Sequence, residues 1–161
     1  MLEFINQYSA IIAIPGFLVV MFALLPIRSW RKRIALYSTV GIIAVAVVLG
    51  LQPGDSTVAS ESEALSVIAS GQPVFVEFFS NSCTACIASE PIVRSLESEV
   101  GDDVQILKLN VRDPIAAQLM RDYRAYLTPT FVVIGRDGEQ VWRQSGGLLN
   151  KGAALKALNA A

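Results

Sequence analysis

Residues 74–86 read VFVEFFSNSCTAC, and both cysteines of the chain, Cys83 and Cys86, lie at the end of this stretch. The Val and Phe residues before them predict a buried β-strand over about residues 72–79. Apolar residues then recur at helical spacing over residues 87–100. The order strand, short turn, helix places Cys83 at the first turn of a helix.

This position suits thiol chemistry. A thiol at a helix N-terminus faces unpaired backbone N–H groups and the positive end of the helix dipole, and both lower its pKa. Cys86 follows one turn later on the same helical face, close enough to attack a mixed disulfide formed on Cys83. The spacing therefore indicates a nucleophilic cysteine followed by a second cysteine that releases the bound partner.

Two other interpretations of the cysteine pair remain open at this stage. In the first, the pair forms half of a zinc-ligand set. The chain has no histidine and no third cysteine, so carboxylates would have to complete that set. A purely structural disulfide between such close residues would close too small a loop to constrain much of the unfolded chain. The composition thus favours redox chemistry of the thiols with no metal and no other cofactor.

The remaining pattern predicts an α/β domain. Ser60 and Glu63 fit a capping box at the start of one helix, and Asp113 before Pro114 fits the cap of another. Early alternation of strands and helices requires parallel strands, and a final hairpin adds an antiparallel edge. The expected helices cover about residues 60–70, 87–100, 114–126 and 151–159, and the expected strands residues 72–79, 104–111, 130–134 and 140–144.

The amino-terminal third has a different composition. Hydrophobic residues make up 53% of the chain and the mean hydropathy is +0.49, with most of the excess in residues 1–52. The uncharged runs 8–27 and 34–51 are each long enough to cross a bilayer as a helix. We expect a two-helix transmembrane hairpin, and the alternative is that the second run is a single retained or cleaved segment.

Charge predicts which side the domain faces. Four basic residues lie in the predicted loop 28–33 between the two apolar runs, and positive charge beside a membrane span stays in the cytoplasm. A linker over residues 53–59 then leads to a domain over residues 60–161 on the outer, periplasmic or lumenal side. From Asp55 onward the chain has nine basic and thirteen acidic residues, which argues against a nucleic-acid partner.

From about residue 60 to residue 160, the sequence resembles the thioredoxin superfamily, and more than the cysteine pair carries the resemblance. An acidic residue stands six positions before the first cysteine, a proline five positions after the second, a lysine in the next strand, and a Thr-Pro pair at the start of the following strand. These residues are Glu77, Pro91, Lys108, Thr128 and Pro129. The resemblance implies a central mixed sheet with helices on both faces.

The resemblance also implies roles for these residues. Cys83 is expected to be the nucleophile and Cys86 the resolving cysteine, joined in a redox-active disulfide when oxidised. Glu77 is expected to be buried and to accept the proton of Cys86, with Lys108 nearby to tune its pKa. Thr128 and Pro129 are expected to form a cis-proline segment against the cysteines that binds substrate backbone.

The sequence departs from the family at positions that set the redox potential. Ser82 replaces the usual Trp before the first cysteine, and Thr84-Ala85 replaces the usual Gly-Pro between the cysteines. The direction of electron flow is therefore left open by the motif. Our leading hypothesis is a membrane-tethered reductase of exported protein disulfides, supplied by an integral-membrane electron donor. The alternatives are a disulfide oxidase or isomerase, and a non-catalytic subunit of a membrane complex.

Overall fold

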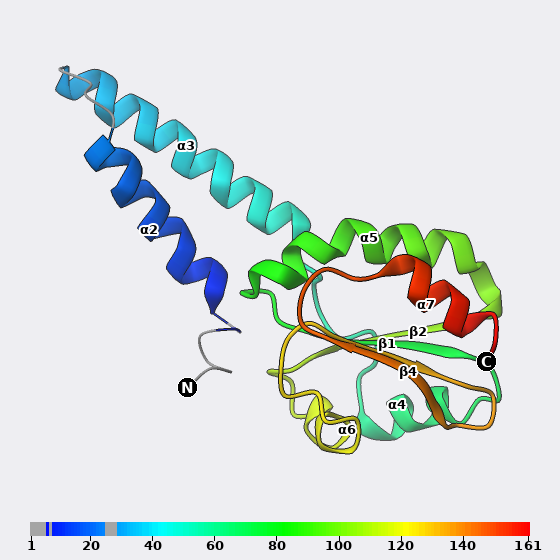
Figure 1. Cartoon of the computed structure of the whole chain (residues 1–161). Helices are drawn as coiled ribbons and strands as arrows, with labels where there is room; N and C mark the ends of the chain where they lie inside the picture. Colours follow the sequence, from blue (N-terminus) through cyan, green and yellow to red (C-terminus); the bar gives the residue numbers. More distant parts are fainter. Residues whose placement is uncertain (1–5, 7, 25–28) are drawn as a thin grey trace.

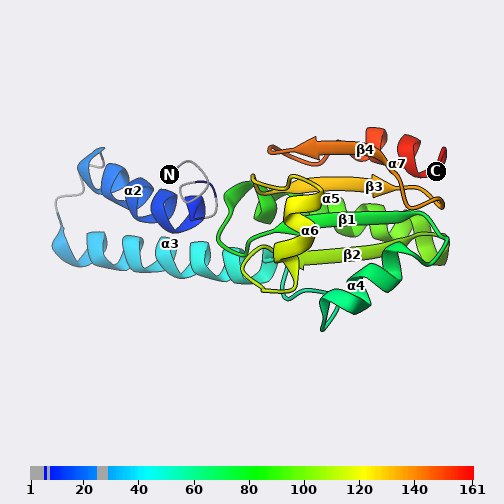
Figure 2. The same cartoon turned by 90° about the horizontal axis from the view of Figure 1, so that it is seen from below.

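A computed structural model of the chain describes residues 6, 8–24 and 29–161, and it has two parts (Figure 1). Helices α2 (Ser9–Leu24) and α3 (Trp30–Leu51) lie side by side and project from an α/β domain (Figures 1 and 2). The hydroxyl of Tyr37 in α3 donates a hydrogen bond of 3.1 Å to the carbonyl oxygen of Met21 in α2.

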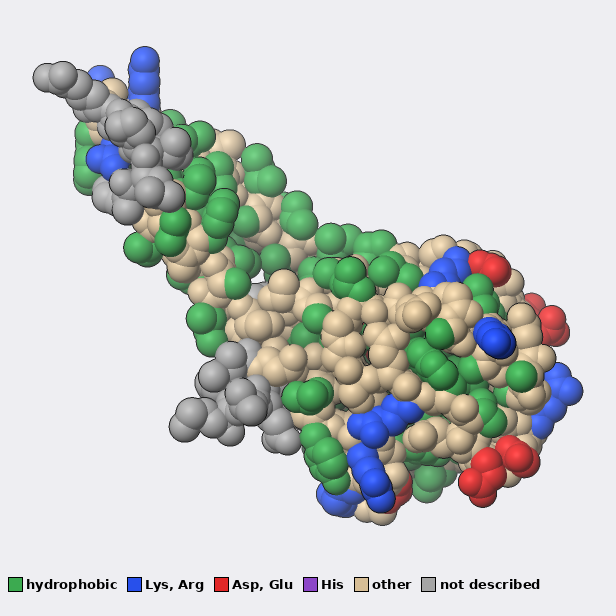
Figure 3. Space-filling model, viewed as in Figure 1, with side chains coloured by type: hydrophobic (Ala, Val, Ile, Leu, Met, Phe, Trp, Pro, Cys, Tyr) green, Lys and Arg blue, Asp and Glu red, His purple; other side chains and the backbone are tan. Residues whose placement is uncertain are grey.

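Helix α3 is the one helix in the described part of the chain that is long and apolar enough to cross a membrane. It has 22 residues, it includes an 18-residue stretch with a mean hydropathy of 2.4, and none of its residues is buried. The apolar part of α2 is shorter, Ile12–Met21. In space-filling view, hydrophobic side chains cover both helices and basic side chains gather at the far tip (Figure 3).

The predicted basic loop is partly helical. Arg31, Lys32 and Arg33 belong to the first turn of α3, which begins at Trp30, because Lys and Arg are good helix formers. Arg28, the fourth residue of the predicted cluster, lies outside the described residues.

The sheet has four strands in the order β2-β1-β3-β4. Strand β1 (Val74–Phe79) is parallel to β2 (Gln105–Asn110) and antiparallel to β3 (Thr130–Ile134), which pairs with the antiparallel edge strand β4 (Gln140–Ser145). The predicted Asp-Gly turn joins the last two strands, with Gly138 at φ 81°, where a side chain would be strained. The expected mixed sheet is confirmed.

Helices cover both faces of this sheet, as predicted. Helices α5 (Thr84–Val100) and α7 (Lys151–Leu158) lie on one face, and α4 (Glu61–Ile68) and α6 (Ala116–Asp122) lie on the other (Figures 1 and 2). A 3-10 turn, Gly101–Asp103, leads from α5 to β2.

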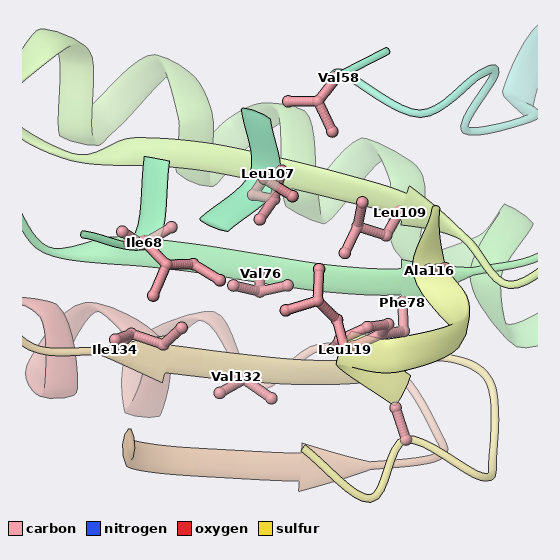
Figure 4. Packing of buried hydrophobic residues seen from close by; sticks show 13 residues of the cluster. Val58, Ile68, Val76, Phe78, Leu107, Leu109, Ala116, Leu119, Val132 and Ile134 are labelled. Atoms are coloured by element: carbon pink, nitrogen blue, oxygen red, sulfur yellow. The ribbon is translucent and has the colours of Figure 1, made fainter. Parts of the chain in front are cut away.

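Residues of the central strand alternate between the two faces. Val76 and Phe78 pack with residues of α4 and α6 in one cluster, part of which Figure 4 shows. Phe75 belongs to the cluster under α5 and α7, where its ring stacks on Phe131 at a centroid distance of 6.0 Å. Because side chains alternate along a strand, Glu77 points to the α5 face, where Phe79 contacts the cysteines.

The two predicted caps have different outcomes. Ser60 accepts a hydrogen bond from the backbone N–H of Glu63, which confirms the cap of α4, and the Glu63 carboxylate accepts from the N–H of Ala59. The cap predicted at Asp113 is wrong: Ile115 occupies the cap position, because a turn that starts at Asp113 delays the helix until Ala116.

The predicted linker is part of the domain. Thr57 donates its backbone N–H to the carbonyl oxygen of Lys108 at 2.9 Å, and Ser56 accepts the N–H of Asn110 at 3.0 Å. The Ser56 hydroxyl donates to the Asp113 carboxylate. This segment therefore satisfies the edge of β2 that would otherwise be open.

Candidate active site

The cysteine pair lies where β1 passes into α5. Cys83 is the N-cap of α5, and its backbone N–H donates to the carbonyl oxygen of Ser80 at 3.1 Å. The backbone N–H of Cys86 donates to the sulfur of Cys83 at 3.3 Å. Both residues are free thiols and both are fully buried. The predicted placement of Cys83 at the start of the helix is confirmed.

The surroundings separate the two thiols in acidity. The pKa of Cys83 is lowered to about 6, mainly because the Cys86 side chain hydrogen-bonds with its sulfur. Hydrogen bonding with Thr128 and with the backbone of Ala85 and Cys86 lowers it further, against the effect of burial. Burial raises the pKa of Cys86, as do its bond to Cys83 and the negative charges of Cys83 and Glu77. At neutral pH the site therefore holds one thiolate and one thiol.

Glu77 lies in the middle of β1, directly across from Lys108 in β2. It is fully buried, and neither of its carboxyl oxygens has a hydrogen-bond partner among the described residues. Its pKa is raised to about 8, chiefly by burial, and the positive charge of Lys108 counteracts only part of that effect. The predicted burial of Glu77 is thus observed.

Lys108 contacts a second acid that the sequence did not point to. Its Nζ lies 3.0 Å from both carboxylate oxygens of Glu90 and 4.0 Å from Glu77 Oε2. Glu90 is 2% exposed and lies in α5 four residues after Cys86. That spacing places Glu90 on the sheet-facing side of the helix, and it is the signal that could have identified the residue.

The Thr-Pro pair faces the nucleophile. The bond between Thr128 and Pro129 is cis, as predicted. In its thiol form, Cys83 donates a hydrogen bond of 3.3 Å to the carbonyl oxygen of Thr128, which is buried. The backbone of Thr128 thus borders the site where a substrate sulfur would approach Cys83.

The amino-terminal segment covers this site, which the sequence did not predict. The Oδ1 atom of Asn6 accepts hydrogen bonds from the backbone N–H of Thr128 at 2.8 Å and from its hydroxyl at 2.7 Å. Ser9 Oγ accepts the backbone N–H of Thr84 at 2.9 Å. The guanidinium of Arg112 lies 4.4 Å from the ring centroid of Tyr8. Asn6 and Ser9 thus bind residues that border Cys83, whose side chain is fully buried in this conformation.

Comparison with known proteins agrees with this geometry. The family model described as thioredoxin matches residues 56–159. The chain belongs to the thioredoxin family. With its Cys83–Cys86 pair it is a thiol–disulfide oxidoreductase, as predicted.

Relatives of this thioredoxin-family chain come from several bacteria and from a eukaryotic organelle. A thioredoxin of Mycolicibacterium smegmatis is 29% identical over 102 residues, 63% of this chain and 89% of the relative. A thiol:disulfide interchange protein, a TxlA homolog of Synechocystis, is 30% identical over 123 residues, 72% of this chain and 68% of the relative. The crystal structure of mitochondrial thioredoxin 3 from Saccharomyces cerevisiae is 21% identical in sequence. It superposes with a TM-score of 0.54 over 65% of this chain and 92% of that structure, which shows that the two share a fold.

Proposed function

We propose that this thioredoxin-family protein is held at a membrane by α2 and α3 and reduces disulfides of exported proteins with electrons from an integral-membrane donor. The observation that carries the proposal is that an apolar helix of membrane-spanning length leads directly into a thioredoxin domain. Because the outward-facing side chains of α3 are apolar and unburied, they need a lipid or protein environment.

The basic residues at the start of α3 support the outer location of the domain. Arg31, Lys32 and Arg33 lie at the tip of the helix pair, away from the domain. Positive charge beside a span is retained in the cytoplasm, so the opposite end of α3 and the domain would face the periplasm or a lumen.

The connection between helix and domain supports a role close to the membrane surface. Gly54, three residues after α3, donates its N–H to Asn81 Oδ1 at 3.1 Å and accepts from Asn81 Nδ2 at 2.8 Å. Asn81 lies two residues before Cys83. The active-site loop is therefore bound to the end of the anchor, and a thiol of an integral-membrane donor would meet Cys83 near the surface.

The match to the Synechocystis relative extends beyond the thioredoxin domain. This match covers 72% of this chain, more than residues 56–161 can supply, so the similarity extends back into α3. The relative's name describes thiol:disulfide interchange, which agrees with the activity proposed for this chain.

The site provides each step of disulfide reduction. The Cys83 thiolate attacks one sulfur of the substrate disulfide, and the other substrate sulfur leaves as a thiolate that takes a proton from water. Cys86 then gives its proton to ionised Glu77 and attacks the Cys83 sulfur. The Cys83–Cys86 disulfide forms, the second substrate sulfur leaves as a thiolate that takes a proton from water, and two electrons have passed from the dithiol to the substrate.

The acidity of Cys83 favours reduction over oxidation. A nucleophile pKa of about 6 is closer to the value of about 7 in thioredoxin than to about 3.5 in the oxidant DsbA. Because a stabilised thiolate makes the reduced form more stable and the couple more oxidising, we expect a potential nearer to about −270 mV than to about −120 mV.

Two measurements test the function. Equilibration of the full chain with glutathione buffers gives the potential of the Cys83–Cys86 couple, and a value above about −180 mV would favour the oxidase or isomerase. Expression of Cys86→Ser should accumulate mixed disulfides on Cys83 with exported proteins and a membrane protein, and Cys83→Ser is the matched control. Trapped partners confined to the cytoplasm would contradict the proposed orientation.

A further inference from the structure

Three charged residues share the space between the sheet and α5. Glu77 comes from β1, Lys108 from β2 and Glu90 from α5, and all three are buried, with exposures of 0%, 7% and 2%. Buried charges are stable only when they are paired and hydrogen-bonded. The arrangement offers two carboxylates to one ammonium, so the contacts of Lys108 decide which carboxylate is stabilised as an anion.

The contacts favour Glu90. Lys108 Nζ donates to both oxygens of Glu90 at 3.0 Å, whereas its distance to Glu77 Oε2 is 4.0 Å, beyond a hydrogen bond. Glu90 Oε1 also accepts from Arg94 Nε at 2.8 Å. Both oxygens of Glu77 lack a hydrogen-bond partner among the described residues.

We propose that Glu90 is a positioning residue for the thiol–disulfide reaction: by binding Lys108 it withholds a hydrogen bond from Glu77 and so holds that carboxyl mostly protonated in the reduced protein. This inference rests on the proposed role of Glu77 as the proton acceptor for Cys86. Glu90 itself acts through Lys108 and touches no reacting atom.

The charges around Glu77 are consistent with this role. Lys108 on β2 favours its ionised form, while Glu90 and Glu97 on α5 and Cys83 at the start of α5 oppose it. Because Glu90 neutralises Lys108 at close range, ionising Glu77 would leave a second buried carboxylate with no hydrogen-bond donor. The raised pKa of about 8 follows from burial together with this arrangement.

The reaction uses the ionised fraction of Glu77. The thiolate of Cys83 is the smallest of the charges that raise the Glu77 pKa, so its loss in a mixed disulfide favours the ionised form only slightly. A carboxyl with a pKa of about 8 is partly ionised at neutral pH, and the ionised form accepts the proton of Cys86, whose thiolate attacks the Cys83 sulfur. The contact between Glu90 and Lys108 thereby sets the pH range over which Glu77 can accept that proton.

Glu90→Gln tests the inference on the full chain. The amide keeps the shape of the side chain but removes the charge that holds Lys108, so the ammonium gains Glu77 as its counter-ion. Carbon-13 NMR of labelled glutamate carboxyls, with the reduced protein in micelles, gives the titration midpoint of Glu77, assigned by its absence in Glu77→Gln. We expect the midpoint to fall by about 1 to 3 pH units.

Glu99→Gln is the matched control, because Glu99 is an exposed carboxylate of the same helix. It should leave the midpoint of Glu77 unchanged. Glu90→Ala should move the midpoint in the same direction as Glu90→Gln, and it serves as a second variant if the first does not fold. An unchanged or higher midpoint in a folded Glu90 variant would overturn the inference.

A kinetic measurement separates this inference from the role of Glu77. The pH profile for release of a model thiol from the Cys83 mixed disulfide should shift to lower pH in Glu90→Gln, and Glu90→Gln added to Glu77→Gln should cause no further shift. If Glu77→Gln alone does not slow this release, the proposed proton acceptor is wrong, whereas the NMR midpoint still reports on Glu90. If the kinetic profile of Glu90→Gln stays unshifted although its NMR midpoint falls, the positioning role in the reaction is wrong.

Discussion

Glu77→Gln is expected to stabilise the folded domain, and the effect should grow with pH. The carboxyl has an ordinary pKa of 4.5 and a folded-state pKa of about 8. The folded state therefore binds this proton more tightly than the unfolded state, so stability is full below pH 4.5 and falls as the pH rises toward 8. The amide of the variant does not titrate, and its stability should not fall over this range.

The magnitude follows from the size of the shift. A raise of about 3.5 pH units at about 1.36 kcal/mol each makes the ionised Glu77 destabilising by about 5 kcal/mol at pH 9. At pH 7, where the folded carboxyl is still mostly protonated, the loss is about 3 kcal/mol. Below pH 4.5 the wild-type and variant domains should have similar free energies of unfolding.

The measurement needs a background in which the thiols do not titrate, because the lowered pKa of Cys83 makes stability rise with pH and would mask the effect. Cys83→Ser/Cys86→Ser removes both thiols, and it removes only the smallest of the charges that raise the Glu77 pKa. Trp30→Phe leaves Trp142 as the single tryptophan of the chain, so its fluorescence reports the domain alone.

Guanidinium unfolding in non-ionic detergent at pH 5, 7 and 9 then gives the free energy of unfolding with and without Glu77→Gln. The exposed carboxylate Glu139 in the β3–β4 turn provides the control, since Glu139→Gln should leave the pH dependence unchanged. A Glu77→Gln domain that loses stability with pH as steeply as its parent would refute the buried, poorly neutralised carboxyl described above.

Three further predictions concern the nucleophile and the core. Iodoacetamide should modify Cys83 at a rate that rises with pH to a plateau above about pH 6, since the thiolate reacts. Asn6→Ala should raise that rate about tenfold, because two hydrogen bonds to Thr128 are lost, each worth about 0.5 to 1.5 kcal/mol. Phe75→Ala should lower the free energy of unfolding by about 3 to 5 kcal/mol, since the ring is fully buried against Phe131.

Each of these has a control or a contrary result. A rate of Cys83 modification that still rises steeply at pH 8 would contradict a lowered thiol pKa. Ser62→Ala, at an exposed position in α4, should not change the rate, and an equal increase there would show that Asn6 is not specific. Val141→Ala on the exposed edge strand should destabilise the domain by less than Phe75→Ala.

Local patterns were sufficient to predict the sheet and the placement of the cysteines. The Val and Phe residues around Glu77 have a composition that suits a buried strand, and helical spacing after Cys86 continues to the end of α5. The resemblance to a family added the cis bond before Pro129, which no local pattern predicts. Element ends were less predictable: α6 starts and stops inside its predicted range because backbone turns at Asp113 and Arg124 replace helical turns.

The pairing of charges was not predictable from the same information. The Cα register of Glu77 and Lys108 matches the expected pair, but Lys108 has a long side chain that reaches α5 and Glu90 is the closer acceptor. Choosing between two acceptors requires the depth of each side chain and the crossing of helix and sheet. For the same reason the contact of Asn6 with Thr128, across 122 positions of the chain, had no sequence signal.

Helices α2 and α3 are joined to the active site by two hydrogen bonds at the domain-facing end of the helix pair (Figure 1). Gly54 after α3 binds Asn81 in the active-site loop, and Ser9 at the start of α2 binds Thr84 beside the nucleophile. If α3 spans a bilayer as proposed, these contacts turn Cys83 toward the membrane surface, and a partner has to approach along that surface and displace Asn6. Under that proposal, the selection of partners depends on where the reactive face points as much as on its potential, and most soluble disulfides would be kept away from the reactive thiolate.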